Sequence, residues 1–390
     1  MDNPTNEPAS AQRGRPLVVG EPAPWFTCRT RARERFVFDT VAGRYVLLCF
    51  FGSAGDPSAA ALLQAVGAAR SRFDDRQLSV FGVSTDPEDE RLGRVVDQVP
   101  GMRFFWDFDR QVCARYGALG SDGQVGRVLY LLDPGLRVLA AQPVDGDGLR
   151  QLAGLLALLD RLPPIGPPVP AAAQAPVLVL PRVFEPGLCE ALVRHYGERG
   201  GIDSGFMQEV DGMTVKRIEY GHKRRRDCEI SDEALRRACM VRLHDRLVPE
   251  IERAFQFRAT RMERYIVSCY DAAEQGHFRA HRDNTTKGTA HRSFAVSLFL
   301  NSGEYEGGQL RFPEYGPALY SAERGGAVVF SCSLLHEATP VTRGRRYMFL
   351  PFLYNEEGRR IRDQNLRYVN LEDPPPGSAA APAAEAAASA

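Results

Sequence analysis

The chain is 390 residues long, which is enough for two domains of ordinary size, each with its own core. Lysine plus arginine and aspartate plus glutamate both number 49, so a net charge of zero gives no general electrostatic argument for nucleic-acid or membrane partners. No apolar run approaches the ~20 residues of a membrane span, and the polar start lacks a secretion-signal pattern. The eight cysteines are scattered without a CxxC pair, as in reduced intracellular proteins. We therefore expect a cytoplasmic protein.

The composition of the chain changes sharply once, at residues 161–176 (RLPPIGPPVPAAAQAP), where proline and alanine dominate. Such a stretch is typical of a semi-extended linker. It separates a predicted domain at residues 17–160 from a second at residues 177–372. The two ends, residues 1–16 and 373–390, are of low complexity and are predicted to be disordered.

The first domain alternates strand-like and helix-like segments. Its strands are short apolar runs rich in β-branched and aromatic residues, and its helices carry apolar residues at helical spacing. This alternation predicts an α/β layer around a central sheet. In chain order we expect a strand at 44–52, a helix at 57–73, a strand at 78–85, a strand pair at 127–133 and 136–144, and a helix at 147–162.

The motifs GEPAPWF, FFGSAGDPSAAALLQ, GVSTDP and GRVLYLLDPGLRVL follow one another in the order found in peroxiredoxins. The first domain resembles that AhpC/TSA-like family, which implies a thioredoxin fold. Peroxiredoxins place their nucleophile in the pattern P-x-x-x-T-x-x-C, but Gly52, Asp56 and Ala59 stand at those three positions, and only Arg127 matches the family's active-site arginine. Alanine cannot supply a thiolate. We interpret the domain as an interaction or stabilising module.

The second domain begins with a short strand and helices and continues as strands separated by glycine-rich turns. A helix is expected soon after Glu185, and Ser231 is expected to open an amphipathic helix over residues 231–255. The strand-rich remainder predicts an antiparallel sandwich or jelly roll with flanking helices. Its expected strands are 264–270, 292–301, 307–314, 325–336 and 345–355.

The stretch HFRAHRDNTT contains a candidate metal site. His281 and Asp283 are two residues apart and therefore point to the same side of an extended chain, and His336 ends another apolar strand. Two histidines and one carboxylate suit a non-haem Fe(II) oxygenase, and a zinc hydrolase can use the same ligands. Arg346, ten residues after His336, distinguishes the two, because an oxygenase that uses 2-oxoglutarate needs a cation for the distal carboxylate.

Three stretches in this half, CYDAAEQGHFRAHRDN, SLFLNSGEYEGGQLRFPEYG and GGAVVFSCSLLHEATPVTRGRRYMFLPFLY, resemble the 2-oxoglutarate/Fe(II)-dependent dioxygenases of the prolyl 4-hydroxylase type over residues 177–356. The resemblance implies an all-β double-stranded β-helix, or jelly roll. It also implies that Arg346 binds the C5 carboxylate of 2-oxoglutarate. The implied iron ligands are His281, Asp283 and His336.

The same resemblance places Tyr270 in the co-substrate pocket, whereas Phe299 stands where some of these hydroxylases have a second tyrosine. It implies Fe(II), 2-oxoglutarate as co-substrate and O2, with ascorbate as a further cofactor. The implied reaction hydroxylates an unactivated C–H bond, in a peptidyl residue such as proline or in a small molecule, and releases succinate and CO2.

Several other polar residues near these motifs have alternative interpretations. His291 is expected at the surface or behind the metal ligands, His277 is expected to be structural, and Arg345 is expected to point away from Arg346. The run KRRR at 223–226 is interpreted as a solvated loop, with substrate anchoring as the alternative. A second function also stays open: a redox-sensing or scaffolding protein whose thioredoxin-like domain binds a partner.

Overall fold

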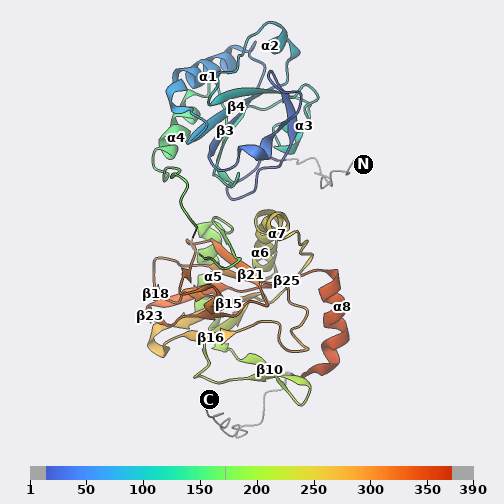
Figure 1. The fold of residues 1–390 in the computed structure, drawn as a ribbon, viewed down its shortest axis with the longest axis vertical. Helices are drawn as coiled ribbons and strands as arrows, with labels where there is room; N and C mark the ends of the chain where they lie inside the picture. Colours follow the sequence, from blue (N-terminus) through green and yellow to red (C-terminus); the bar gives the residue numbers. More distant parts are fainter. Residues whose placement is uncertain (1–14, 172, 371–390) are drawn as a thin grey trace. The chain divides into compact units, whose positions relative to one another are not determined.

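The structure, a computed structural model, describes residues 15–171 and 173–370 of the chain. The ends predicted to be disordered, residues 1–16 and 373–390, lie outside these ranges except at residues 15–16. The chain divides into two compact units between Pro170 and Ala171, and each unit is described by itself (Figure 1). Among the described helices, none is long and apolar enough to cross a membrane.

The first unit is built on one mixed sheet of seven strands. Its three central strands run parallel, as the predicted α/β alternation requires, and the strands at both sides are antiparallel. The spatial order is β2 (Phe36–Val37), β1 (Thr27–Thr30), β5 (Met102–Trp106), β4 (Leu78–Ser84), β3 (Tyr45–Gly52), β6 (Val128–Leu132) and β7 (Val138–Pro143).

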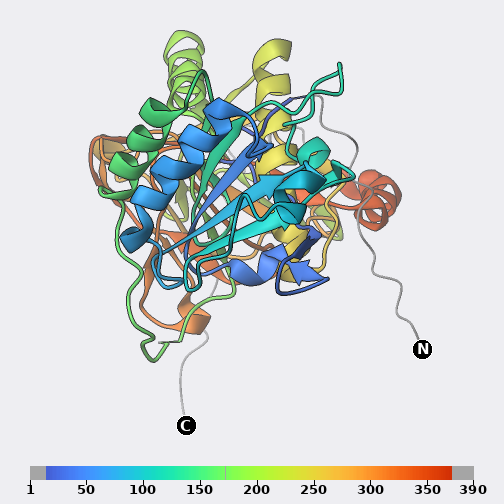
Figure 2. The same ribbon diagram turned by 90° about the horizontal axis from the view of Figure 1, so that it is seen from above.

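Helices cover both faces of this sheet, so the central strands are buried on each side. Leu62 and Leu152 come from two helices that lie side by side on one face, and Val112 and Tyr116 pack on the other (Figures 1 and 2). This is the predicted thioredoxin-like α/β domain. Its helices are α1 (Pro57–Ala68), α2 (Pro87–Arg91), α3 (Gln111–Arg115) and α4 (Leu149–Leu159). Within the predicted linker, Pro163 accepts a hydrogen bond from the Tyr45 hydroxyl at 2.8 Å.

An ion pair lies beside Ala59, the residue at the position that holds the nucleophile in peroxiredoxins. Asp56 caps α1, since its Oδ1 accepts a hydrogen bond from the Ala59 amide at 2.9 Å, and the same oxygen lies 2.7 Å from Arg127 Nη1. The Ala59 methyl group is fully buried. Burial also raises the pKa of Cys28 and of Cys49 to about 12. No thiolate is therefore available near this helix start in the described part of the unit.

The full-length protein is expected to show no thiol-dependent peroxidase activity. The test is hydrogen peroxide consumption with dithiothreitol as reductant and EDTA present to suppress metal-catalysed loss. The expected rate equals that of buffer. If the protein consumes peroxide faster than buffer does, and this excess disappears when Cys28, Cys49 or Cys113 is replaced by serine, a thiol in this domain is reactive.

The second unit contains two main sheets that pack face to face, as a jelly roll requires. Tyr270, Ala295 and Met348 from the larger sheet share one core with Leu310 and Phe278 from the smaller sheet. The larger sheet contains β14 (Arg261–Glu263), β25 (Phe352–Tyr354), β17 (Phe294–Phe299), β24 (Arg345–Phe349), β15 (Ile266–Asp271), β13 (Arg226–Glu229) and β9 (Ile202–Asp203), with β21 (Ala327–Ser331) beside β17 and β8 (Leu178–Leu180) beside β21. The smaller contains β12 (Lys223–Arg224), β16 (His277–His281), β22 (His336–Ala338), β19 (Leu310–Arg311) and β20 (Leu319–Tyr320).

The outer face of the larger sheet is covered by helices α5 (Pro186–Arg199), α6 (Glu233–Arg246) and α7 (Val248–Phe255). The prediction of one continuous helix over residues 231–255 was wrong. The helix breaks at Leu247, because Pro249 in the first turn of α7 has no N–H group to continue the hydrogen bonding. The cap is Asp232, whose carboxylate accepts from the Leu235 amide at 2.8 Å, and not Ser231.

Two parts of this unit were not predicted as regular structure. One is the hairpin of β10 (Phe206–Val210) and β11 (Met213–Arg217), with β26 (Val369–Asn370) beside β11. The other is helix α8 (Glu356–Asn365). A further small pair joins β18 (Glu306–Gly307) to β23 (Val341–Arg343).

Candidate active site

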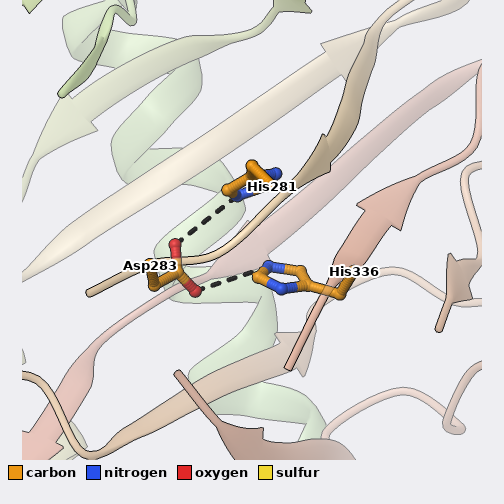
Figure 3. Close-up of side chains that lie close together, drawn as sticks. All are labelled: His281, Asp283 and His336. Carbon is orange, nitrogen blue, oxygen red and sulfur yellow. Dashed lines mark ion pairs between the residues drawn. The ribbon is translucent and has the colours of Figure 1, made fainter. Parts of the chain in front are cut away.

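Two neighbouring strands of the smaller sheet bring the predicted metal ligands together. His281 ends β16 and pairs directly with His336, the first residue of β22. Asp283 follows β16 by two residues, so its carboxylate points to the same side as His281. The three side chains face one another in Figure 3, with Asp283 between the two imidazoles.

The three candidate ligand atoms lie within 4.8 Å of one another. His281 Nε2 is 3.5 Å from one carboxylate oxygen of Asp283, and His336 Nε2 is 3.4 Å from the other. Both imidazoles are held by rings beside them: Phe278 stacks on His281 with centroids 3.5 Å apart, and Phe330 lies 4.5 Å from His336. These aromatic contacts fix the ring positions and keep water from that side.

Backbone hydrogen bonds set the tautomer of both histidines. His281 Nδ1 lies 2.8 Å from the Arg279 carbonyl, and His336 Nδ1 lies 3.0 Å from the Leu334 carbonyl. A carbonyl can only accept, so each Nδ1 donates its proton and the neutral ring keeps a lone pair on Nε2. Burial lowers the pKa of His336 to about 4, which keeps this ring neutral at neutral pH.

The carboxylate of Asp283 stays ionised in this buried position. Burial acts to raise its pKa, but the positive charge that His336 and His281 carry when protonated lowers it more, so the pKa falls below its ordinary value. When both rings are neutral, the lone pairs of two nitrogens and one oxygen converge on one point, which is unfavourable until a cation lies there. The residues fit a divalent metal ion, and this donor set suits Fe(II) or Zn2+.

A buried arginine faces the same cavity from the larger sheet. Alternation along β24 turns Arg345 outward to Asp271, at 2.7 Å, and turns Arg346 inward, where it is 1% exposed. Arg346 Nε and Nη2 have no hydrogen-bond partner among the described residues. The guanidinium carbon lies 4.9 Å from the Tyr270 ring and 5.3 Å from the Phe299 ring. A buried cation without an anion is costly, so this position favours an anionic ligand.

Space for Arg346 depends on Gly308. This glycine has φ +67°, and a Cβ atom there would lie 2.6 Å from Arg346 Cδ. A cavity of about 570 Å³ connects the arginine to the three candidate ligands and to Tyr270. The metal-binding and anion-binding groups thus belong to one site between the two sheets.

Two other histidines of the sequence analysis lie outside the cavity lining. His291 is not at the surface: it is buried, and its Nε2 lies 2.9 Å from Glu263. Glu263 also holds Arg292, whose Nη1 lies 3.4 Å from the Asp283 carbonyl, so His291 is linked indirectly to the chain at Asp283. His277 is half-buried and lies 2.8 Å from the Gln275 carbonyl through Nδ1.

The interpretation of residues 223–226 as a solvated loop was wrong. Lys223 and Arg225 are 5% and 7% exposed and line the cavity, whereas Arg226 is exposed. The physical reason is strand alternation through β12 and β13, which turns every second side chain inward. Asp227 continues the inward series, and this basic–basic–acidic pattern at a spacing of two was the signal available in the sequence.

Comparisons with known proteins give the same division of the chain. Residues 265–354 match the family model of the 2OG-Fe(II) oxygenase superfamily, and residues 19–141 match that of the AhpC/TSA family. A PKHD-type hydroxylase of Pseudomonas putida is 36% identical over 197 residues, which are 47% of this chain and 77% of that protein.

A PKHD-type hydroxylase of Nitrosomonas europaea is 30% identical over 125 residues, 28% of this chain, so the chain spans about half (54%) of the length of this relative. Among solved structures, a Pseudomonas putida prolyl-4-hydroxylase has 18% identity and a TM-score of 0.34, covering 47% of this chain and 94% of that one.

Replacing His336 with alanine is expected to abolish stoichiometric binding of Fe(II), because one of three converging donors is lost. Anaerobic titration calorimetry of the full-length protein measures this directly. His277→Ala is the matched control, since it removes a histidine from the same sheet outside the cavity, and should bind like the wild type. Unchanged binding in His336→Ala would contradict the assignment of this residue.

Proposed function

Since the chain belongs to the 2OG-Fe(II) oxygenase superfamily through its second unit, we propose that this unit is a 2-oxoglutarate- and Fe(II)-dependent dioxygenase. It hydroxylates an unactivated C–H bond of a peptidyl residue or a small molecule and releases succinate and CO2. The observation that carries the proposal is the position of Arg346, a buried arginine with unpaired N–H groups, across one cavity from His281, Asp283 and His336.

His281, Asp283 and His336 would hold Fe(II) through two Nε2 atoms and one carboxylate oxygen. When bound, the iron supplies the activation of O2 that oxidises a C–H bond, which no amino-acid side chain supplies. The protein holds the imidazoles in the required tautomer through their Nδ1–H groups and keeps the Asp283 carboxylate ionised. Such outer hydrogen bonds orient ligands and increase their basicity.

Arg346 would bind the distal carboxylate of 2-oxoglutarate through its free Nε and Nη2 groups. These two N–H groups lie on one edge of the guanidinium and suit a bidentate contact with a carboxylate. The rings of Tyr270 and Phe299 hold the guanidinium and desolvate it, which strengthens a contact with an anion. Phe299 has no hydroxyl group to share the contact.

Arg346 also separates this proposal from the alternatives. A hydrolytic zinc site uses the same ligands but has no need of a buried arginine for an acidic co-substrate. A redox-sensing function would need an accessible thiol, but all eight cysteines, each within the described residues, are buried.

We further propose that ascorbate is the reductant that keeps the iron ferrous, as the family resemblance implies. We also propose a cytoplasmic location, as the composition implies.

The full-length protein, supplied with Fe(II), 2-oxoglutarate, ascorbate and O2, is expected to form succinate slowly without a substrate. Succinate can be measured by mass spectrometry. His281→Ala, Asp283→Ala and His336→Ala should each reduce it to the background of Fe(II) in buffer. Wild-type turnover in any of them would disprove the assignment of that ligand.

Arg346→Ala is expected to weaken the apparent affinity for 2-oxoglutarate by roughly 30- to several thousand-fold. A desolvated charge-assisted contact is worth ~2–5 kcal/mol, and ~1.4 kcal/mol corresponds to a factor of ten. Fe(II) binding should survive, because Arg346 is not a ligand, and Arg346→Lys should recover only part of the affinity.

The matched control is Arg345→Ala, which removes the neighbouring arginine from the outer side of β24. Its 2-oxoglutarate affinity should equal that of the wild type. The assignment fails if Arg345→Ala weakens the affinity and Arg346→Ala does not.

A further inference from the structure

A second group of basic side chains lines the cavity that also contains Arg346. Lys223 and Arg225 are buried there at the junction of β12 and β13, and Arg264 lines the same wall. The Lys223 ammonium lies 4.7 Å from the centre of the Phe278 ring, and Phe278 stacks on His281. A single aromatic ring therefore separates this basic group from a candidate metal ligand.

One carboxylate pairs with two of the three basic groups. Asp227 Oδ2 accepts from Arg225 Nη2 at 2.8 Å and from Arg264 Nη2 at 3.3 Å, and the carboxylate also accepts from the hydroxyls of Ser204 and Ser268. Its hydrogen-bonding capacity is thus in use.

The hydrogen bonds of Lys223 go to neutral acceptors. Its ammonium donates to Ser204 Oγ at 2.8 Å and to the Gly205 carbonyl at 2.5 Å. Arg225 Nε is buried without a hydrogen-bond partner in the described part of the chain. Lys223 therefore has no anionic hydrogen-bond partner among the described residues, and Arg225 keeps a free Nε–H group beside its ion pair with Asp227.

The electrostatics of this wall agree with an excess of positive charge. Burial, and next the charge of Arg225, lower the pKa of Lys223 well below its ordinary value. Burial and Arg225 also lower the pKa of Arg264 to about 10. An anion placed against these groups would offset both effects.

The co-substrate does not supply this anion under the proposed function. One carboxylate of 2-oxoglutarate belongs at the metal and the other at Arg346. The charges of Fe(II), Asp283, Arg346 and the 2-oxoglutarate dianion cancel, so the wall with Lys223 and Arg225 keeps its excess positive charge after the co-substrate has bound. Tyr270 lies between the two arginines, with its hydroxyl 3.4 Å from Arg225 Nη1 and its ring beside Arg346.

We propose that Lys223 and Arg225 bind a carboxylate of the substrate, so that the molecule to be hydroxylated carries a free carboxylate near its reacting C–H bond. This proposal rests on the proposed function and adds the chemical class of the substrate. The ammonium and the free Nε–H of the guanidinium anchor the carboxylate, while the rest of the substrate lies along Phe278 toward His281 and His336. The cavity of about 570 Å³ accommodates a small acid or one chain terminus together with 2-oxoglutarate.

The test measures carboxylate binding without metal and without turnover. The parent protein is the full chain with Arg346→Met, which removes the proposed co-substrate arginine. The probes are N-acetylglycine and N-acetylglycinamide, which differ only in the charged group. The apparent affinity comes from the dependence of Tm on probe concentration at constant ionic strength. N-acetylglycine should raise the Tm of the parent, and the amide should not.

Three variants added to the parent locate the binding. Lys223→Met keeps the aliphatic stem against Phe278 and should weaken N-acetylglycine binding about tenfold or more, with a modest fall in the Tm of the free protein from the lost hydrogen bonds to Ser204 and Gly205. Arg225→Lys keeps a charge next to Asp227 and should weaken binding severalfold. Arg224→Met is the matched control, since that side chain lies over Tyr220 outside the cavity, and should bind like the parent.

Each of three outcomes would overturn the proposal. The acid and the amide could bind equally, binding could be unchanged in both Lys223→Met and Arg225→Lys, or Arg224→Met could lose as much affinity as those two variants. A merely structural Lys223 would lower the Tm of the free protein and leave the probe affinity unchanged. Because the test contains neither iron nor 2-oxoglutarate, failure of the wild type to form succinate would count against the proposed function alone.

A further arm distinguishes the two sources of such a carboxylate. N-acetyl-tetraalanine with a free carboxylate is compared with its C-terminal amide in the same parent protein. Lys223-dependent binding of N-acetylglycine alone supports a small free acid. Lys223-dependent binding of both acids supports the proposal with a peptide terminus as the source.

Discussion

The second unit holds two imidazole nitrogens and one carboxylate oxygen with their lone pairs directed at one buried point, and the rest of the site is arranged around that point. The imidazoles of His281 and His336 cannot turn away, because their Nδ1–H groups are held by backbone carbonyls and their faces by Phe278 and Phe330. Asp283 lies between them and stays ionised. Without a cation these groups repel one another. The local fold therefore holds a preorganised cation site, which lowers the free energy of unfolding of the metal-free protein.

The two sheets divide the chemistry of the site between them. The smaller sheet contributes the converging donors, and the larger sheet contributes Arg346 and Tyr270 from adjacent strands. Arg225, just before β13, adds a second cation next to the Tyr270 hydroxyl. The cavity thus combines one point that attracts a cation with two walls that attract anions. Because these groups are desolvated, each selects its ligand by charge more strongly than it would in water.

The local parts of this architecture were predictable from the sequence. The spacing of His281 and Asp283 and the alternation that separates Arg345 from Arg346 follow from the period of two in a strand. The pairing of His281 with His336 depends on a contact across 55 residues, which no local pattern encodes. Pro249 was visible in the sequence, and its effect on the predicted helix was missed.

The basic run at residues 223–226 shows why charged segments are hard to interpret. Consecutive charged residues usually lie at the solvent-exposed surface, since burying a charge is costly. Here Asp227 and neutral acceptors offset the cost of burying these charges. The neutral acceptors lie far from the run in the sequence, so the local pattern does not reveal them. The spacing of two indicated that alternate side chains share a face, and the folded chain shows that Lys223 and Arg225 are the two that face inward.

The ion pair between Asp56 and Arg127 makes the lost peroxiredoxin chemistry hard to regain by a single substitution. A cysteine restored at Ala59 would find its helix-terminal amide already bonded to the Asp56 carboxylate, and the arginine already neutralised by it. The adjacent negative charge would also disfavour a thiolate. Reversal therefore requires changes at two or more positions together. The first unit thus combines a thioredoxin-like fold with a helix start whose amide and arginine are both engaged by a carboxylate.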